Sequence, residues 1–500
     1  MIYPGTIFLN WLLALPFFGA AGAELFSRFA RHLRSDEEAR ATRERGPFAL
    51  GALASLMGAA LAATLLRAVW AGERVAADYW WTRGLYQLRF QADLLGVSVA
   101  LVVFLAGLFI HLHLLGRRGG EESGHRAALL LLAQGSASAT ALSADIIVLL
   151  FMLCLTILAL SALASRHSSP QVEWLFIAGH GGWLLVLVGA LVMWREAGDT
   201  SLVSLPLLLL SAAPETLRLI GVATLLGVAP LLAVFPVHGW LPALGRVSPE
   251  LALGPVPLLM LAGGGALLRL LPGSLELPLV PAVPGICVVM GLATLWWGAL
   301  RAWLSRSLVG LAVWVTVAQS GYLLVALGAA GRASAPPELL QAASLHVLLG
   351  SIALVGLWSS VLVTAERAGT DSLAGLSGLC KVMPVAGATL LVSGLSLAGC
   401  PVLAGYSVQR LLIGGLLDTG RPLLATGLVV VDILLATAVL NALRQAFLRR
   451  ETAPSLRPAS VWSTLALSLV SLSLVTLGIW TTPAVSLTKM IARSVLSLSP

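Results

Sequence analysis

Apolar segments of roughly 20 residues recur along the whole chain and are separated by short polar loops. Hydrophobic residues make up 58% of the sequence and charged residues only 11%, far below the charge content of a soluble domain. Segments of this length cross a bilayer as helices, because a helix pairs its own backbone polar groups where no water is present. The sequence therefore predicts an all-α polytopic membrane protein.

We expect about fourteen membrane-spanning helices. They fall near residues 5–26, 47–71, 93–115, 127–142, 145–165, 172–194, 216–236, 250–272, 279–299, 307–330, 340–364, 380–417, 421–447 and 460–482. Most of the 31 Lys and Arg residues lie in loops that follow odd-numbered helices. Basic loops stay in the cytoplasm, so we predict that both termini lie outside.

Two prolines interrupt the apolar helix that begins near residue 216. Pro230 and Pro236 each remove a backbone donor, and carbonyls near Leu226 and Leu232 lose their partners. In lipid the freed groups need another helix or water to satisfy them. Transporters use broken helices of this kind to build ion sites near the middle of the membrane.

The sequence contains no soluble domain and no cofactor motif. The arginines sit in short loops and form no basic face, which excludes a nucleic-acid-binding protein. The four cysteines, Cys154, Cys287, Cys380 and Cys400, are too scattered for a metal motif. We therefore expect no cofactor in this chain and no catalytic site of its own.

Three motifs in order resemble one family of membrane subunits. The first is FPVHGWLPALGRVSP from Phe235, the second is AQSGYLLVAL from Ala318, and the third runs from Leu373 to Gln409 and contains LSLAGCPVLAG. They are similar to motifs of the antiporter-like subunits shared by NADH:quinone oxidoreductase (complex I), membrane-bound hydrogenases and Mrp antiporters. The resemblance covers roughly residues 90 to 450 and implies a multi-pass protein of the cytoplasmic membrane.

The resemblance also implies two inverted repeats, helices 4–8 and 9–13, each with one broken helix. Pro236 marks the first break and Pro401 marks its counterpart. The resulting units are residues 1–126 with helices 1–3, 127–272 with the first repeat, 273–450 with the second repeat, and 451–500 with the last helix and a short tail.

Members of this family move protons through charged side chains buried at mid-membrane. The resemblance places four of those positions at neutral residues of this chain: Cys154, Leu231, Ala262 and Gln409. The two lysines, Lys381 and Lys489, lie elsewhere. A buried charge costs at least about 2.5 to 3.5 kcal/mol near the bilayer centre, so its absence indicates that the usual relay is lost.

A different set of polar residues offers a candidate proton path: His346, Gln319, His238 and Asp432. His346 matches a histidine of the family, and imidazole exchanges protons near neutral pH. The structural alternative is that each residue makes an interhelical hydrogen bond or anchors a helix end at the lipid interface. For His238 we favour the anchoring role. Arg410, next to Gln409, sets a positive field but cannot release a proton.

Three functions agree with these observations. The first is a divergent subunit of a complex I or hydrogenase-type assembly that is structural or only indirectly coupled to proton transport. The second is the membrane subunit of an energy-coupled inorganic-carbon uptake system with a soluble zinc protein as partner. The third is a proton or sodium carrier with a rewired path. In the first case other membrane subunits and a soluble redox arm are the partners, and they would hold the iron-sulfur clusters, flavin and quinone.

Overall fold

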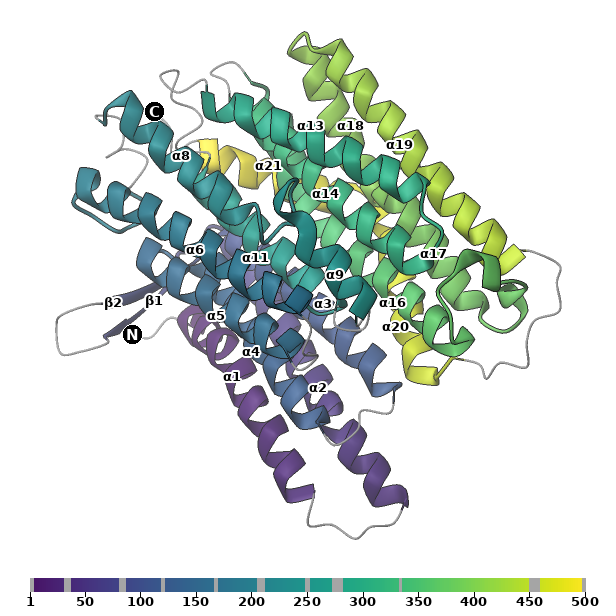
Figure 1. Ribbon diagram of the computed structural model, residues 1–500. Coiled ribbons are helices and arrows are strands. Elements are labelled where there is room, and N and C mark those ends of the chain that lie inside the picture. The colour runs from purple at the N-terminus through teal and green to yellow at the C-terminus, as the bar shows by residue number, and fades with distance from the viewer. Residues whose placement is uncertain are drawn as a thin grey trace.

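The computed structural model describes residues 4–30, 37–80, 87–117, 122–165, 170–204, 212–247, 252–271, 282–331, 335–448 and 459–496. Within these ranges the chain forms a bundle of helices (Figure 1), and ten helical segments are long and apolar enough to cross a membrane. The expectation of a helical polytopic membrane protein is therefore confirmed. The described part of the chain also contains shorter helices, and two pairs of them flank breaks.

The long helices are α1 (Pro4–Ala30), α2 (Glu37–Trp70), α3 (Leu94–Leu115), α4 (Ser123–Leu142), α5 (Ile146–Ser165), α6 (Pro170–Ala197), α13 (Ala282–Trp303), α14 (Leu308–Ala330), α16 (Ser351–Ala368), α19 (Pro422–Leu443) and α20 (Val461–Ile479). The shorter helices are α8 (Pro214–Val228), α9 (Trp240–Val247), α11 (Pro255–Leu270), α15 (Pro337–Leu345), α17 (Pro384–Leu397), α18 (Gly405–Asp418) and α21 (Thr482–Leu496). Segments η2 (Val237–Gly239), η4 (Leu373–Gly375) and η5 (Leu379–Lys381) are single 3-10 turns, and η3 (His346–Gly350) and η6 (Arg444–Leu448) are π-helical.

Several helices begin earlier than their apolar segments. α2 starts at Glu37 and includes the charged run before residue 47, and α4 starts at Ser123. Glu, Ala and Arg favour a helix in water, so the end of the hydrophobic run does not set the end of the helix. The predicted boundary between residues 126 and 127 consequently falls inside α4. The other two predicted boundaries, at 272/273 and 450/451, lie outside the described residues.

A β-hairpin precedes α3 and departs from the all-helical expectation. Strand β1 (Val75–Trp80) pairs antiparallel with β2 (Gln87–Ala92), so that Ala77 lies opposite Phe90. Side chains alternate between the two faces of a strand, and Val75, Ala77, Phe90 and Ala92 are all buried on one face. That buried face holds the hairpin against α1 and α3.

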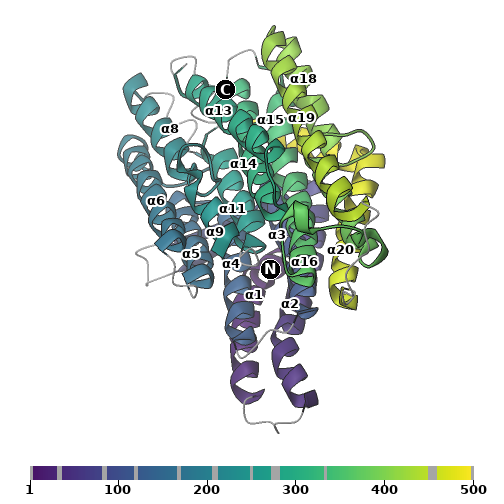
Figure 2. The ribbon, with the colours of Figure 1, turned by 45° about the vertical axis from the view of Figure 1, so that its right-hand side comes forward.

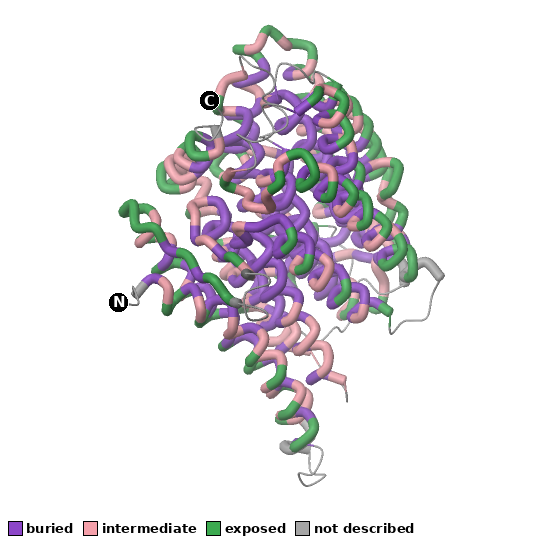
Figure 3. The backbone as a smooth tube through the Cα atoms, turned by 90° about the vertical axis from the view of Figure 1, so that its left-hand side faces the viewer, coloured by how far each residue is buried: buried purple, intermediate pink, exposed green. Residues whose placement is uncertain are grey.

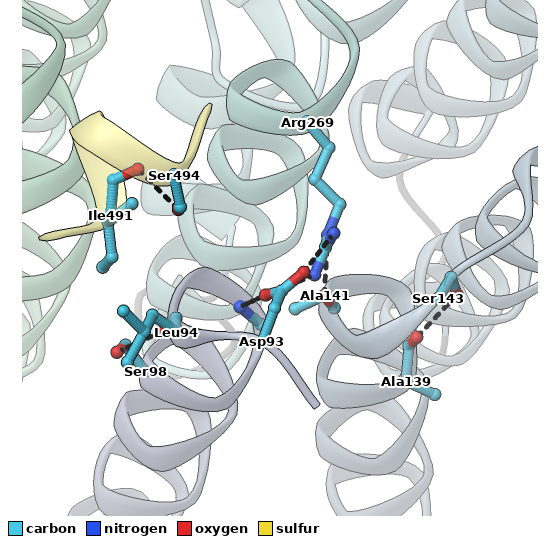
Figure 4. Close-up of polar contacts among 10 residues, drawn as sticks. Asp93, Leu94, Ser98, Ala139, Ala141, Ser143, Arg269, Ile491 and Ser494 are labelled. Carbon is cyan, nitrogen blue, oxygen red and sulfur yellow. Dashed lines mark hydrogen bonds and ion pairs between the residues drawn. The ribbon is translucent and has the colours of Figure 1, made fainter. Parts of the chain in front are cut away.

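An ion pair joins the hairpin's end to the first half of the bundle (Figure 4). Arg269, near the end of α11, makes contacts of 2.9 Å with both carboxylate oxygens of Asp93 and donates through Nε to the Ala141 carbonyl at 2.7 Å. Asp93 also caps α3 by accepting from the Gly96 amide at 2.6 Å. Two parallel charge-assisted hydrogen bonds give such a pair a fixed geometry. α11, α3 and α4 are therefore tied together at one end.

The loop after α6 packs against the start of α5 at the same end. The Thr200 hydroxyl donates to Asp145 at 2.6 Å, and Asp145 accepts from the Ile147 amide at 2.8 Å, as expected of a residue that caps a helix. Asp199 accepts from the Ser204 hydroxyl at 2.6 Å. This hydrogen bond, together with the amides of Ser201 and Thr200, holds the pKa of Asp199 below its usual value.

Buried residues run through the middle of the bundle, and exposed residues lie on the outer helices (Figure 3). The exposed residues include large apolar ones such as Phe18, Trp194 and Ile433. Residues 339–364, which run from α15 through η3 into α16, are all buried, and α14 is nearly so. α1 and α2 extend beyond the other helices at one end (Figure 2). Exposed apolar faces of this kind suit lipid contact.

The predicted short tail contains a further helix, α21. It packs against α15, where the side-chain amide of Gln341 donates to the backbone carbonyl of Val485 at 2.8 Å. Its sequence is too polar to have been predicted as a membrane span, because charged Lys489 and Arg493 interrupt it.

Candidate functional site

The first break lies between α8 and α9. α8 ends at Val228, two residues before Pro230, and residues 229–236 are not helical. The Trp240 indole donates to the Pro230 carbonyl at 2.7 Å, and the Ser320 hydroxyl donates to the Leu232 carbonyl. The carbonyl near Leu232, which the sequence left without a partner, is thus satisfied by another helix. Trp240 is buried at this position.

Most side chains at the first break are apolar, although the Thr294 hydroxyl there accepts a hydrogen bond from the Phe235 amide at 3.1 Å. Leu231 and Leu232 are 2% and 3% exposed, and Ala262 on α11 is 1% exposed. Gly263 follows Ala262, and a Cβ on Gly263 would lie 3.2 Å from Leu232 and 3.5 Å from Leu231. Leucine side chains therefore fill the space beside α11. Cys154 on α5 is half-buried with a free thiol.

The second break lies between α17 and α18 and contains Pro401. α17 ends at Leu397 and α18 begins at Gly405, whose amide donates to the Ser396 hydroxyl at 3.1 Å. Gly399 has a φ of +69°, and a Cβ there would come within 2.2 Å of the Gln409 side chain. Glycine at this position therefore supplies the left-handed turn and leaves the room that Gln409 occupies.

A small cavity beside this second break has room for about one water molecule. Its walls come from α14, η3, the start of α16, the end of α17 and the start of α18. The lining residues are Gln319, His346, Leu349, Gly350, Ala353, Ser396, Leu397, Gly405, Val408 and Gln409. We call this space the break-2 cavity. It brings together three of the residues singled out from the sequence, His346, Gln319 and Gln409.

His346 and Gln319 face each other across helices. His346 Nε2 lies 2.9 Å from the backbone carbonyl oxygen of Gln319. Because a carbonyl oxygen only accepts hydrogen bonds, Nε2 carries the proton of the neutral ring and Nδ1 is left as an acceptor. The side-chain amide of Gln319 donates through Nε2 to the backbone carbonyl of Leu397 at 3.1 Å. The side chain of Gln319 thus satisfies a carbonyl at the end of the broken helix.

Gln409 lies between the break-2 cavity and Tyr322 on α14. Its Oε1 is buried and has no hydrogen-bond partner among the described residues, while its side chain also reaches the Tyr322 hydroxyl. Tyr322 is buried on α14 and donates to the carboxylate of Asp432 on α19. The Tyr322 and His346 rings lie 6.1 Å apart. Polar side chains therefore extend from His346 and Gln409, which both line the cavity, through Tyr322 to Asp432.

His238 lies away from this series. It is half-buried in η2 between the rings of Phe235, 5.6 Å away, and Trp314, 5.7 Å away. The guanidinium of Arg301 lies 4.7 Å from the Trp314 centroid. The break-2 cavity is lined without His238. Of the four residues of the candidate path, the structure therefore groups His346, Gln319 and Asp432 and leaves His238 in an aromatic cluster.

Sequence reasoning missed Ser320 and Ser396 at the two breaks and Tyr322 beside the break-2 cavity. Tyr322 lies three positions after Gln319 on α14, and residues at this spacing share a helix face, which was the available signal. Ser320 and Ser396 gave no such signal, because their roles depend on carbonyls and amides freed in distant helices.

A separate polar cluster in α2, α3 and α4 holds His111. Its Nδ1 lies 2.8 Å from the Gly107 carbonyl and 3.3 Å from the Gln134 amide, and the Ser55 hydroxyl lies 2.9 Å from Gln134. All three side chains are fully buried. This arrangement is an interhelical hydrogen-bond network of the kind that holds membrane helices together.

The sequence of residues 146–436 matches the family described as NADH:quinone oxidoreductase/Mrp antiporter, transmembrane. This is more than half of the chain. The chain belongs to this family. The NADH-quinone oxidoreductase subunit N of Desulforudis audaxviator is 26% identical over 374 residues, which cover 73% of this chain and 73% of that protein. The expected family resemblance is therefore confirmed, and the protein is a multi-pass integral membrane protein.

Two solved assemblies contain chains with the same fold. One is the membrane-bound sulfane sulfur reductase, an archaeal respiratory membrane complex, with a TM-score of 0.85 at 16% identity and 98% coverage of both chains. The other is respiratory complex I from Thermus thermophilus, with a TM-score of 0.82 at 18% identity and 98% and 99% coverage. At these identities the likeness concerns the fold alone.

Proposed function

We propose that this protein is a divergent antiporter-like membrane subunit of a multi-subunit assembly of the complex I or Mrp type. In this proposal it lies in the cytoplasmic membrane with both termini outside. It crosses the membrane about fourteen times when each interrupted helix is taken as one crossing. The helices from α4 to α11 form one inverted repeat and those from α13 to η6 form the other, each with one break.

We further propose that the usual buried charge relay is lost and that the subunit is structural or only indirectly coupled to proton transport. The first break supports this proposal, because Leu231 and Ala262, at two of the relay positions, are buried apolar residues. Neither side chain can accept or release a proton. Redox cofactors, in this reading, belong to partner subunits or a soluble arm.

The decisive experiment uses the complex purified from its native membrane through a tag on this chain. Proton transport by the purified chain in proteoliposomes should equal that of empty liposomes, and neighbouring membrane subunits should purify with it. Iron and acid-labile sulfide in the preparation would place the chain in a redox assembly. Zinc with one soluble partner and no redox arm would instead support an inorganic-carbon uptake system.

One observation favours a second function, a proton carrier with a rewired path. His346 and Gln409 line a cavity with room for about one water molecule, and the nearby Tyr322 hydroxyl donates to Asp432. Histidine exchanges protons readily and water can bridge the remaining gap. If the wild-type chain does carry protons, His346→Ala should abolish the flux, whereas Thr437→Val on exposed α19 should leave it unchanged. Flux that persists in His346→Ala would exclude this path.

A further inference from the structure

One face of α18 carries an arginine among lipid-exposed residues. Tyr406 and Leu417 are 40% and 52% exposed, and Arg410 and Gly414 lie between them at helical spacing. A Cβ on Gly414 would meet nothing within 4 Å. We call these four residues the α18 stripe. Gln409, one position before Arg410, points the other way and lines the break-2 cavity.

Arg410 lies deep along α18. The helix ends at Asp418, about two turns or roughly 12 Å further along, and begins at the break on the other side. We take the charged end of the helix at Asp418 as the membrane surface; half of a hydrocarbon core is roughly 15 Å thick, so the backbone of Arg410 then lies within it. Within the described part of the chain, Arg410 makes no hydrogen bond and no ion pair.

An exposed, unpaired arginine at this depth is unfavourable in lipid. α18 and α19 lie at an outer edge of the bundle (Figures 1 and 2), so a neighbouring protein has access to this face. Gly414 leaves room for a second helix to approach the backbone closely, as small residues do in membrane interfaces. The stripe therefore combines a fixed positive charge with space for a helix.

We propose that the α18 stripe docks a transmembrane helix of a neighbouring subunit and that this helix supplies an Asp or Glu carboxylate to Arg410. A guanidinium pairs with a carboxylate through two parallel hydrogen bonds, and the pairing removes the cost of the lone charge. A phospholipid headgroup offers similar oxygens, but its phosphate lies at the membrane surface, roughly 12 Å from Arg410 along the helix. A side chain on a crossing helix reaches the required depth.

This inference rests on the proposed membership of a multi-subunit assembly. It is tested by a photo-cross-linking aromatic residue in place of Tyr406 in the intact native complex. We expect a cross-link to one membrane subunit, within about one turn of an Asp or Glu in a transmembrane helix. A cross-link to lipid alone, or to a helix without a carboxylate near that depth, would contradict the inference.

Charge variants then test the pair itself. Arg410→Gln removes an unfavourable lone charge if the face meets only lipid, but it leaves a partner carboxylate unpaired if the pair exists. We expect Arg410→Gln and Arg410→Glu to reduce the co-purifying subunit by about tenfold or more. Arg218→Glu, at an exposed position of α8, serves as the control and should retain the subunit.

Replacement of the partner's carboxylate by Arg should restore binding to Arg410→Glu. An intact complex that tolerates both Arg410 variants would refute the inference and leave the proposed function standing. A wild-type chain that purifies without any membrane subunit would contradict the proposed function as well. Equal thermal unfolding midpoints of the isolated chains would show that the variants fold.

Discussion

Gln319 and Ser320 are neighbours on α14, yet their side chains donate to carbonyls in the two different breaks. Gln319 donates to Leu397 at the second break and Ser320 donates to Leu232 in the first. A freed carbonyl in a membrane interior needs a donor from another helix. One turn of α14 therefore satisfies both broken helices at once, which makes α14 the element on which the two halves depend.

Replacing Gln319 by Leu should destabilise the protein by about 1 to 3 kcal/mol, because the buried carbonyl of Leu397 would lose its donor. The thermal unfolding midpoint in mild detergent would measure this loss. Thr437→Val is the control, since the exposed Thr437 hydroxyl bonds only within its own helix. An unchanged midpoint for Gln319→Leu would mean that the bond contributes nothing to stability.

Introducing the missing charge at the first break should not create a proton pump. Leu231→Lys places an ammonium among leucines and should destabilise the protein by at least about 2.5 to 3.5 kcal/mol. Gln409→Lys should likewise give no proton uptake, because the other relay positions remain neutral. Leu423→Lys, at a position 87% exposed, should be tolerated. Proton uptake in proteoliposomes by either single variant would refute the proposed loss of the relay.

Gly399→Ala should disturb the break-2 cavity directly. A Cβ would overlap Gln409, and an alanine at a φ of +69° is strained by about 1 to 3 kcal/mol. Gly22→Ala in α1 is the matched control, because a Cβ there meets nothing within 4 Å. The thermal unfolding midpoint of Gly399→Ala should therefore be lower than that of Gly22→Ala. Equal midpoints would show that the Gln409 side chain moves aside at no cost in stability.

The loop after α6 should lose structure in acid. Ser204 and the amides of Thr200 and Ser201 hold the pKa of Asp199 below its ordinary value. The folded loop therefore gains stability above the ordinary pKa of Asp, about 3.9, and loses it as the pH falls through the lower folded value.

Ser204→Ala should raise the pKa of Asp199 toward its usual value, because Ser204 makes the strongest of these contacts. Loss of protection at the Thr200 and Ser201 amides, followed by hydrogen exchange against pH, should then occur at higher pH than in the wild type. Ser473→Ala, whose hydroxyl bonds within α20, should leave the transition where it is.

Much of the fold follows from the sequence, because hydrophobic runs and prolines act locally. The apolar segments predicted the long helices, and Pro230 and Pro401 lie inside the two interruptions. Helix starts such as Glu37 were missed because polar residues also form helices once outside the membrane. The hairpin was missed because its stability comes from burial against α1 and α3 rather than from its own short strands.

The candidate site was predictable in part for a related reason. Gln319 and Gln409 were visible as polar residues in apolar surroundings, whereas the link through Tyr322 to Asp432 depends on how α14 and α19 pack. His238 shows the limit of motif reasoning, since its sequence context resembles the family while its ring lies among aromatic side chains. Contacts between distant helices are set by packing, which a single sequence does not display.

The ion pair between Arg269 and Asp93 restricts how the first half can move. β2 ends at Ala92 and α3 begins at Leu94, so Asp93 is the hinge point between the hairpin and the bundle. Any rotation of α11 must therefore either swing the hairpin and α3 along with it or break both contacts to the guanidinium. The start of α3 and the ends of α4 and α11 would therefore move together as one rigid unit, on which a neighbouring subunit could act.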